Sequence, residues 1–310
     1  MPVHRLSCWL LFLVFSASGL FATESPKVIP MELRHNLPFV QVMVNGQGPF
    51  TFGIDTGTGG KALVTPDLIQ QLGLPVIGEA EVGDPSGRNP KTVRSVEIKS
   101  MKLGDVEFNN ITAVEFQPSR ALGQTDGILG FVLFRDYLFS LDYPAAEIRL
   151  SHGSLAPDGN RQVLSFRMPN KVPLIELGVG GMKVDTHIDS RGRGLGIPEK
   201  LARDLKFVSS PVVIGRGKTV SSDFEIKGAQ LAADIHLGTY TFTRPFVEIN
   251  PVFPVANFGS IPLSHFAVTF DQKNKLVRFV CGDKDIVIAP PKSGPPPAAP
   301  PVTVAPGPSE

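Results

Sequence analysis

Two aspartates are the residues of this sequence best suited to acid–base chemistry. Asp55 follows an apolar run and opens the sequence Asp-Thr-Gly-Thr-Gly, and Asp189 follows a second apolar run and opens Asp-Ser-Arg-Gly. Two carboxylates held close together share one proton, because both cannot ionise cheaply, so that one serves as acid and the other as base. Such a pair can activate a water against an amide carbonyl without a metal or a nucleophilic serine.

The segments that must position these aspartates resemble each other. Residues 37–44 resemble residues 172–179, and each run leads to its aspartate after a similar interval, so that the aspartates lie 134 positions apart. Short helices are predicted after both, over 65–73 and 197–205, each with a proline at its start. A single Asp-Thr-Gly is usually a turn that ends a strand. Two aspartates at equivalent positions of a repeat predict similar lobes whose aspartates meet at a pseudo-twofold axis.

The composition favours strands over helices. The 310 residues include 31 glycines, 29 prolines and 21 phenylalanines, and several apolar runs alternate as half-buried strands do. We therefore expect an all-β fold with short helices, built as two homologous β-barrel-like lobes over residues 28–153 and 160–284.

Both ends of the chain differ from the predicted lobes. Residues 1–22 combine a basic start, an apolar run and small residues, which is typical of a secretory signal peptide. We expect export to the periplasm or the medium, and no membrane span once the signal is removed. Residues 289–310 are proline-rich without apolar periodicity, which predicts a disordered tail.

Charge and histidine placement exclude several other functions. The formal net charge is +1, which gives no basic face for nucleic acid. None of the six histidines forms a metal-ligand pair at helical spacing, and no glycine-rich segment has the setting of a nucleotide site. We expect neither a metal nor a cofactor.

The sequence from Ile54 through Asp-Thr-Gly-Thr-Gly, together with Asp126-Gly-Ile-Leu-Gly, resembles the pepsin/retropepsin superfamily of aspartic proteases in a short tandem bacterial form. The resemblance implies a bilobal endopeptidase, monomeric, that acts on peptides or proteins. Asp55 and Asp189 would form its catalytic dyad. Gly57 belongs to the first motif, Thr58 would support the outer oxygen of Asp55, and Thr56 would hydrogen-bond across the axis with Ser190.

The same resemblance places a flap, a hairpin that closes over substrate, at the stretch Gly83, Asp84, Pro85, Ser86 and Gly87. This stretch lacks the tyrosine of the pepsin-type flap.

The second motif departs from the family at Arg191, which stands where the family has glycine, and at Gly192, which replaces the threonine of the first motif. A cation beside the dyad lowers carboxylate pKa values and favours its doubly ionised form. Three interpretations are open. Arg191 turns outward to solvent in an active protease, or it contacts a substrate carboxylate, or the site is degenerate and the protein is a catalytically silent peptide-binding scaffold.

Overall fold

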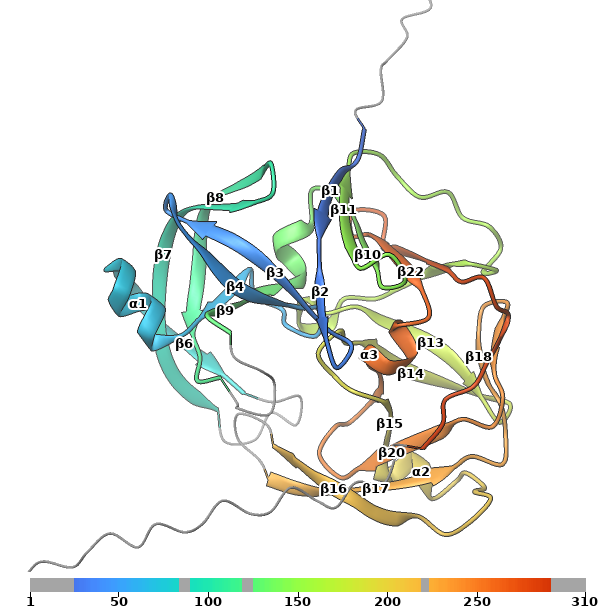
Figure 1. Ribbon diagram of the computed structural model, residues 1–310. Coiled ribbons are helices and arrows are strands. Elements are labelled where there is room, and N and C mark those ends of the chain that lie inside the picture. The colour runs from blue at the N-terminus through green and yellow to red at the C-terminus, as the bar shows by residue number, and fades with distance from the viewer. Residues whose placement is uncertain (1–24, 84–89, 119–124, 219–222, 291–310) are drawn as a thin grey trace, which may run out of the picture.

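The computed structural model describes residues 25–83, 90–118, 125–218 and 223–290. Strands account for 54% and helices for 9% of the structure. The predicted all-β class is therefore confirmed. In Figure 1 the strands β3, β4, β7 and β8 lie on one side of the molecule and β13, β14, β18 and β20 on the other.

The first lobe is one eight-stranded sheet that curls on itself. Its strands are, in spatial order, β2 (Glu32–Arg34), β3 (Leu37–Val44), β4 (Gln47–Asp55), β9 (Gly127–Gly130), β5 (Ala62–Val64), β8 (Val106–Glu115), β7 (Lys91–Leu103) and β6 (Val76–Val82). An additional pairing of β3 with β7 joins Met43 to Lys102. This pairing closes the sheet into a barrel and leaves β6 at an edge.

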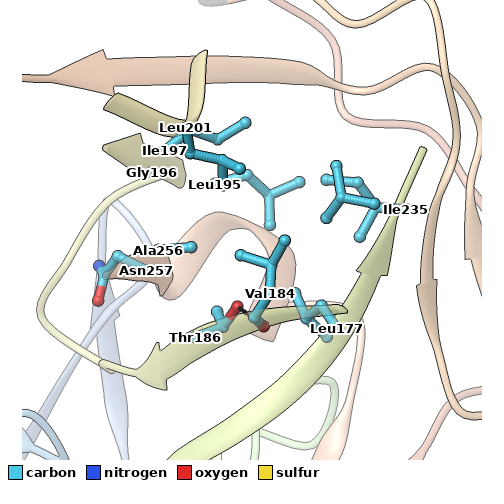
Figure 2. Close-up of a pocket in the computed structure, with 11 residues that line it drawn as sticks. Leu177, Val184, Thr186, Leu195, Gly196, Ile197, Leu201, Ile235, Ala256 and Asn257 are labelled. Carbon is cyan, nitrogen blue, oxygen red and sulfur yellow. Dashed lines mark hydrogen bonds between the residues drawn. The ribbon is translucent and has the colours of Figure 1, made fainter. Parts of the chain in front are cut away.

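The second lobe is a ten-stranded sheet. Its strands are, in spatial order, β16 (Val212–Lys218), β17 (Asp223–Gln230), β20 (Phe246–Asn250), β15 (Leu195–Pro198), β21 (Ala256–Phe258), β14 (Met182–Ile188), β13 (Leu174–Val179), β18 (Ile235–Leu237), β19 (Tyr240–Phe242) and β24 (Asp285–Ile286). Beneath β15 the lobe encloses a small apolar cavity, around which Leu177, Val184, Leu195 and Ile235 converge in Figure 2.

A six-stranded sheet joins the lobes. Its strands are β1 (Lys27–Pro30), β11 (Glu147–Ser151), β10 (Leu138–Asp142), β22 (Ala267–Asp271), β23 (Leu276–Val280) and β12 (Val163–Ser165). At its centre β10 and β22 pair antiparallel, and the hydroxyls of Ser140 and Thr269 lie 2.8 Å apart. The rings of Phe139 and Phe270 stack at 5.9 Å across the same pair of strands. Burial of each such ring stabilises the joint by about 2 kcal/mol.

The described helices are short. Of the two predicted helices, the first is confirmed and the second is shorter than predicted. The described helices are α1 (Pro66–Leu72), α2 (Glu199–Ala202), α3 (Ser260–Leu263) and the 3-10 turns Phe131–Phe134 and Pro169–Lys171. Helix α1 matches its prediction: Thr65 accepts from the backbone N–H of Leu68, and Gly73 ends the helix at φ 57°. Helix α2 is shorter than predicted because Pro198 belongs to β15 and brings no side-chain cap. No helix in the described ranges is long and apolar enough to cross a bilayer.

Candidate active site

Parallel strand pairs carry both aspartates to the same depth between the lobes. Asp55 is the last residue of β4, where it pairs with Gly130 of β9. Asp189 directly follows β14, and its N–H donates to the carbonyl of Phe258 on β21 at 3.0 Å. Each aspartate therefore stands at the end of a strand, at a place fixed by the neighbouring strand of its own lobe.

Thr56 and Ser190 bind the two strand ends to each other. The Thr56 hydroxyl donates to the carbonyl of Ile188 at 2.8 Å and accepts from the N–H of Ser190 at 3.0 Å. In return, the Ser190 hydroxyl donates to the carbonyl of Ile54 at 2.8 Å and accepts from the N–H of Thr56 at 3.0 Å. Both side chains are fully buried. The exchange is reciprocal, so the two aspartates that flank it face each other across a local twofold axis.

The inner oxygens of the two carboxylates converge over Gly57. A Cβ on Gly57 would lie 3.0 Å from Oδ1 of Asp189 and 3.2 Å from Oδ1 of Asp55, so a side chain there would displace the dyad. Backbone N–H groups hold these inner oxygens: Gly57 donates to Asp55 at 2.8 Å, and Arg191 and Gly192 donate to Asp189 at 3.0 and 2.8 Å.

The outer oxygens are treated differently in the two lobes. Oδ2 of Asp55 accepts a hydrogen bond from the Thr58 hydroxyl at 2.8 Å. Oδ2 of Asp189 faces Gly192, which has no side chain to donate. The sequence has Gly192 where the first motif has Thr58. The structure shows the consequence, since residue 192 offers no hydroxyl to the outer oxygen of Asp189.

The dyad keeps a proton well above the usual carboxyl range. Burial and the neighbouring charge of Asp189 raise the pKa of Asp55 from 3.8 to about 6, against the opposing effects of Arg191, Thr58 and the Gly57 N–H. Below that pH one carboxyl is protonated and its neighbour can be ionised, which is the charge state that acid–base catalysis on one water requires.

Arg191 is buried and does not turn outward to solvent. Its side chain is 7% exposed, and its guanidinium carbon lies 5.0 Å from the centroid of the Phe39 ring in the first lobe. The guanidinium also occupies the space beside Gly53, where a Cβ would lie 2.1 Å from Nη1. This burial contradicts the solvent-facing interpretation, and it leaves little surface for contact with a substrate carboxylate.

Sequence reasoning did not identify Gly53 and Phe39 as parts of the site. The signal was available in part, because Gly53 and His187 occupy the same register in their lobes: Gly53 pairs with Ile128, and His187 with Asn257. The second lobe has the His187 side chain at this register, whereas Gly53 in the first lobe has none. The guanidinium of Arg191 lies in the space that this leaves beside Gly53. Burial lowers the pKa of His187, so the imidazole is neutral at neutral pH.

The predicted flap falls on the connection of a two-stranded hairpin. Strands β6 and β7 pair antiparallel up to Val82 and Lys91, and Gly83 is exposed just beyond β6. Asp84, Pro85, Ser86 and Gly87 lie outside the described residues. The hairpin has a counterpart in the second lobe, where β16 and β17 pair Arg216 with Glu225.

Comparison with known proteins agrees with this geometry. No curated protein matches the chain. Residues 40–133, which include Asp55, Thr58 and the strands β4 and β9, match the family model described as aspartyl protease. The first lobe is therefore similar to aspartyl proteases, and this similarity supports the resemblance of the chain to the pepsin/retropepsin-like family.

Proposed function

We propose that this protein is an endopeptidase that hydrolyses peptide bonds with Asp55 and Asp189 as its catalytic pair. The family supplies the general aspartic protease function. The observation that carries the assignment of the pair is the reciprocal hydrogen bonding of Thr56 and Ser190, because it fixes two aspartates from different lobes face to face.

Asp55 and Asp189 have different roles in the proposed reaction. The raised pKa of Asp55 makes it the acid, and Asp189, with two N–H donors on its inner oxygen, is the base. Asp189 takes a proton from a water as the water oxygen bonds to the amide carbon, and Asp55 gives its proton to the carbonyl oxygen. The tetrahedral intermediate then collapses: one of its hydroxyls returns a proton to Asp55 as the C=O bond re-forms, the C–N bond breaks, and the leaving nitrogen takes up the proton held by Asp189.

We expect the substrate to bind as an extended strand between the lobes, under the β6–β7 hairpin, with main-chain groups that pair as in a sheet.

Arg191 is the residue that bears on the alternative function, a silent peptide-binding scaffold, because a cation beside the dyad opposes protonation of the dyad. Burial and the mutual repulsion of the carboxylates outweigh that opposition in the pKa of Asp55. The balance favours an active enzyme that works at acid pH.

The test is cleavage of an unstructured protein mixture by the purified protein from pH 3 to pH 8. Wild type, Asp55→Asn and Asp189→Asn are compared, each with and without a statine-type inhibitor. We expect wild type to cleave below about pH 6 and both variants to be inactive. A folded wild type that binds peptides and cleaves none of them at any pH would replace the protease proposal with the scaffold.

We also propose that the protein is exported, on the strength of the signal-like pattern of residues 1–22. N-terminal sequencing of protein recovered from outside the cytoplasm tests this proposal. A mature N-terminus near residue 20 or 23 supports it, and an intact residue 1 contradicts it.

A further inference from the structure

We infer that Asn257 is a positioning residue of the dyad, and that its side-chain amide donates to the outer oxygen of Asp189 in place of the threonine that the second motif lacks. The inference rests on the proposed protease function and adds an assignment of roles within it.

Gly192 is the structural counterpart of Thr58. In the first lobe the carbonyl of Thr58 accepts from the N–H of Phe131 at 3.0 Å, and in the second the carbonyl of Gly192 accepts from Ser260 at 2.7 Å. The Thr58 hydroxyl bonds the outer oxygen of Asp55. A donor for Asp189 must therefore reach the spot where a side chain on Gly192 would begin.

Asn257 occupies that spot. A Cβ on Gly192 would lie 2.1 Å from Nδ2 of Asn257 and 2.8 Å from Oδ2 of Asp189, so the amide nitrogen and the outer oxygen face the same small volume. In the first lobe the corresponding residue is Ile128, which pairs with Gly53 as Asn257 pairs with His187. An amide thus stands in the second lobe where the first has an alkyl side chain, on the side where the hydroxyl is missing.

Asn257 borders the same apolar cavity as its strand neighbour Ala256, but its side-chain amide is turned away from the cavity (Figure 2). Ala256 faces the apolar cavity of the second lobe together with Leu195, Ile197 and Leu201, whereas the amide of Asn257 points away from that cavity in Figure 2. Hydrogen bonds around a catalytic pair are often long in a free enzyme and tighten when substrate binds. We place the Asn257 bond to Asp189 among these.

The chemistry of the two donors differs, and the difference assigns the proton. A threonine hydroxyl both donates and accepts, so Thr58 can bond Asp55 in its protonated resting state as well as in its ionised state. The amide NH2 group only donates, so it favours an ionised Asp189. Loss of Asn257 therefore destabilises the state with Asp189 ionised relative to the doubly protonated dyad. The dyad loses its second proton from Asp55, and Asp189 is ionised both before and after that step. The loss of Asn257 therefore leaves the higher dyad pKa unchanged.

The charged and titratable groups that act on Asp189 besides Asp55 are His187, Arg191 and Tyr143. Burial raises the pKa of Tyr143, so the phenol stays neutral. Arg191 stays cationic across the acid range. Burial lowers the pKa of His187 in the acid direction, and a His187→Gln background removes its contribution to the profile.

The experiment compares pH–rate profiles of wild type and the near-isostere Asn257→Leu, which removes the donor without adding a charge, with Thr58→Val as the matched control in the other lobe. For Asn257→Leu we expect the acid limb to move up by roughly one pH unit and the alkaline limb to stay. We expect kcat to fall about tenfold with little change in KM, as for one hydrogen bond to a charged group. Thr58→Val should instead move the alkaline limb up, because the Thr58 bond lowers the pKa of Asp55.

The double variant Gly192→Thr with Asn257→Ile copies the first-lobe arrangement and should restore the acid limb, whereas Gly192→Thr alone should not, since its side chain meets Nδ2 of Asn257. An acid limb unmoved in Asn257→Leu would overturn the inference. If wild type cleaves nothing, the protease proposal fails, and the same comparison is made by NMR titration of the dyad carboxyls. In that titration, the inference is overturned if the lower of the two dyad pKa values is the same in Asn257→Leu as in wild type.

Discussion

The guanidinium carbon of Arg191, a second-lobe residue, lies over the ring of Phe39 in the first lobe, 5.0 Å from its centroid. A buried guanidinium over an aromatic face gains about 1–2 kcal/mol from the ring. The contact holds a fixed positive charge beside the dyad while it ties the lobes together. Arg191 thus has an effect on protonation and an effect on stability, and different substitutions separate the two.

Arg191→Met should shift the alkaline limb of the pH–rate profile upward by roughly one unit. The sign follows from the charge: Arg191 lowers the pKa of Asp55, so its removal raises that pKa above about 6 and keeps the dyad protonated at higher pH. Arg191→Lys is the control, because it keeps the charge and loses the guanidinium group over the Phe39 ring. It should leave the limb in place and lower only the Tm. An unchanged limb in Arg191→Met would show that the cation does not tune the dyad.

Gly53→Ala should reproduce the pH effect of Arg191→Met without any change at Arg191. The new methyl would lie 2.1 Å from Nη1, so the guanidinium has to leave its place on Phe39. Combining Gly53→Ala with Arg191→Gly should relieve part of the stability loss, which a double-mutant cycle of urea unfolding measures. Strictly additive losses would contradict the packing described for this pair.

Asp55→Asn should abolish cleavage and stabilise the fold above pH 6. The folded protein holds a proton on Asp55 between about pH 3.8 and 6 that the unfolded chain has released, so the stability of wild type falls as pH rises through that window. Asparagine does not titrate. Urea unfolding at pH 3.5, 5 and 7 should therefore show the variant gaining on wild type as pH rises, by about 3 kcal/mol at pH 7. A constant difference across the three pH values would argue against the raised pKa.

Thr56→Val should cost about 2 kcal/mol of stability, because it leaves the Ile188 carbonyl and the Ser190 N–H buried without their partner. It should also lower kcat more than it raises KM, since the carboxylates lose their common alignment. Thr56→Ser retains the hydroxyl and should preserve most of both quantities. A Thr56→Val enzyme with normal kcat would show that the interlobe bonds are not needed to align the pair.

The fold class and the pairing of Asp55 with Asp189 could be predicted because both depend on local sequence pattern and on its recurrence. The position of Arg191 could not, since it depends on the space at Gly53 and on the ring of Phe39, which lie far away in sequence. Helix α2 was overpredicted because Ile197 and Pro198, which look like a helix start, are taken into β15 by pairing with β20. The role of Asn257 depends on a register that only the folded sheet reveals.

The pairing of Gly53 with an incoming Arg191 also restricts which halves can fit together. Gly57 is the first-half counterpart of Arg191. A pair made of two first halves would therefore have no arginine at this position, and the space at each Gly53 would stay unfilled. Two copies of the second half would drive each Arg191 toward His187, where the first half offers a glycine. The two halves are therefore complementary: the second supplies the Arg191 side chain and the first supplies the space at Gly53. Neither half is expected to pair well with a second copy of itself.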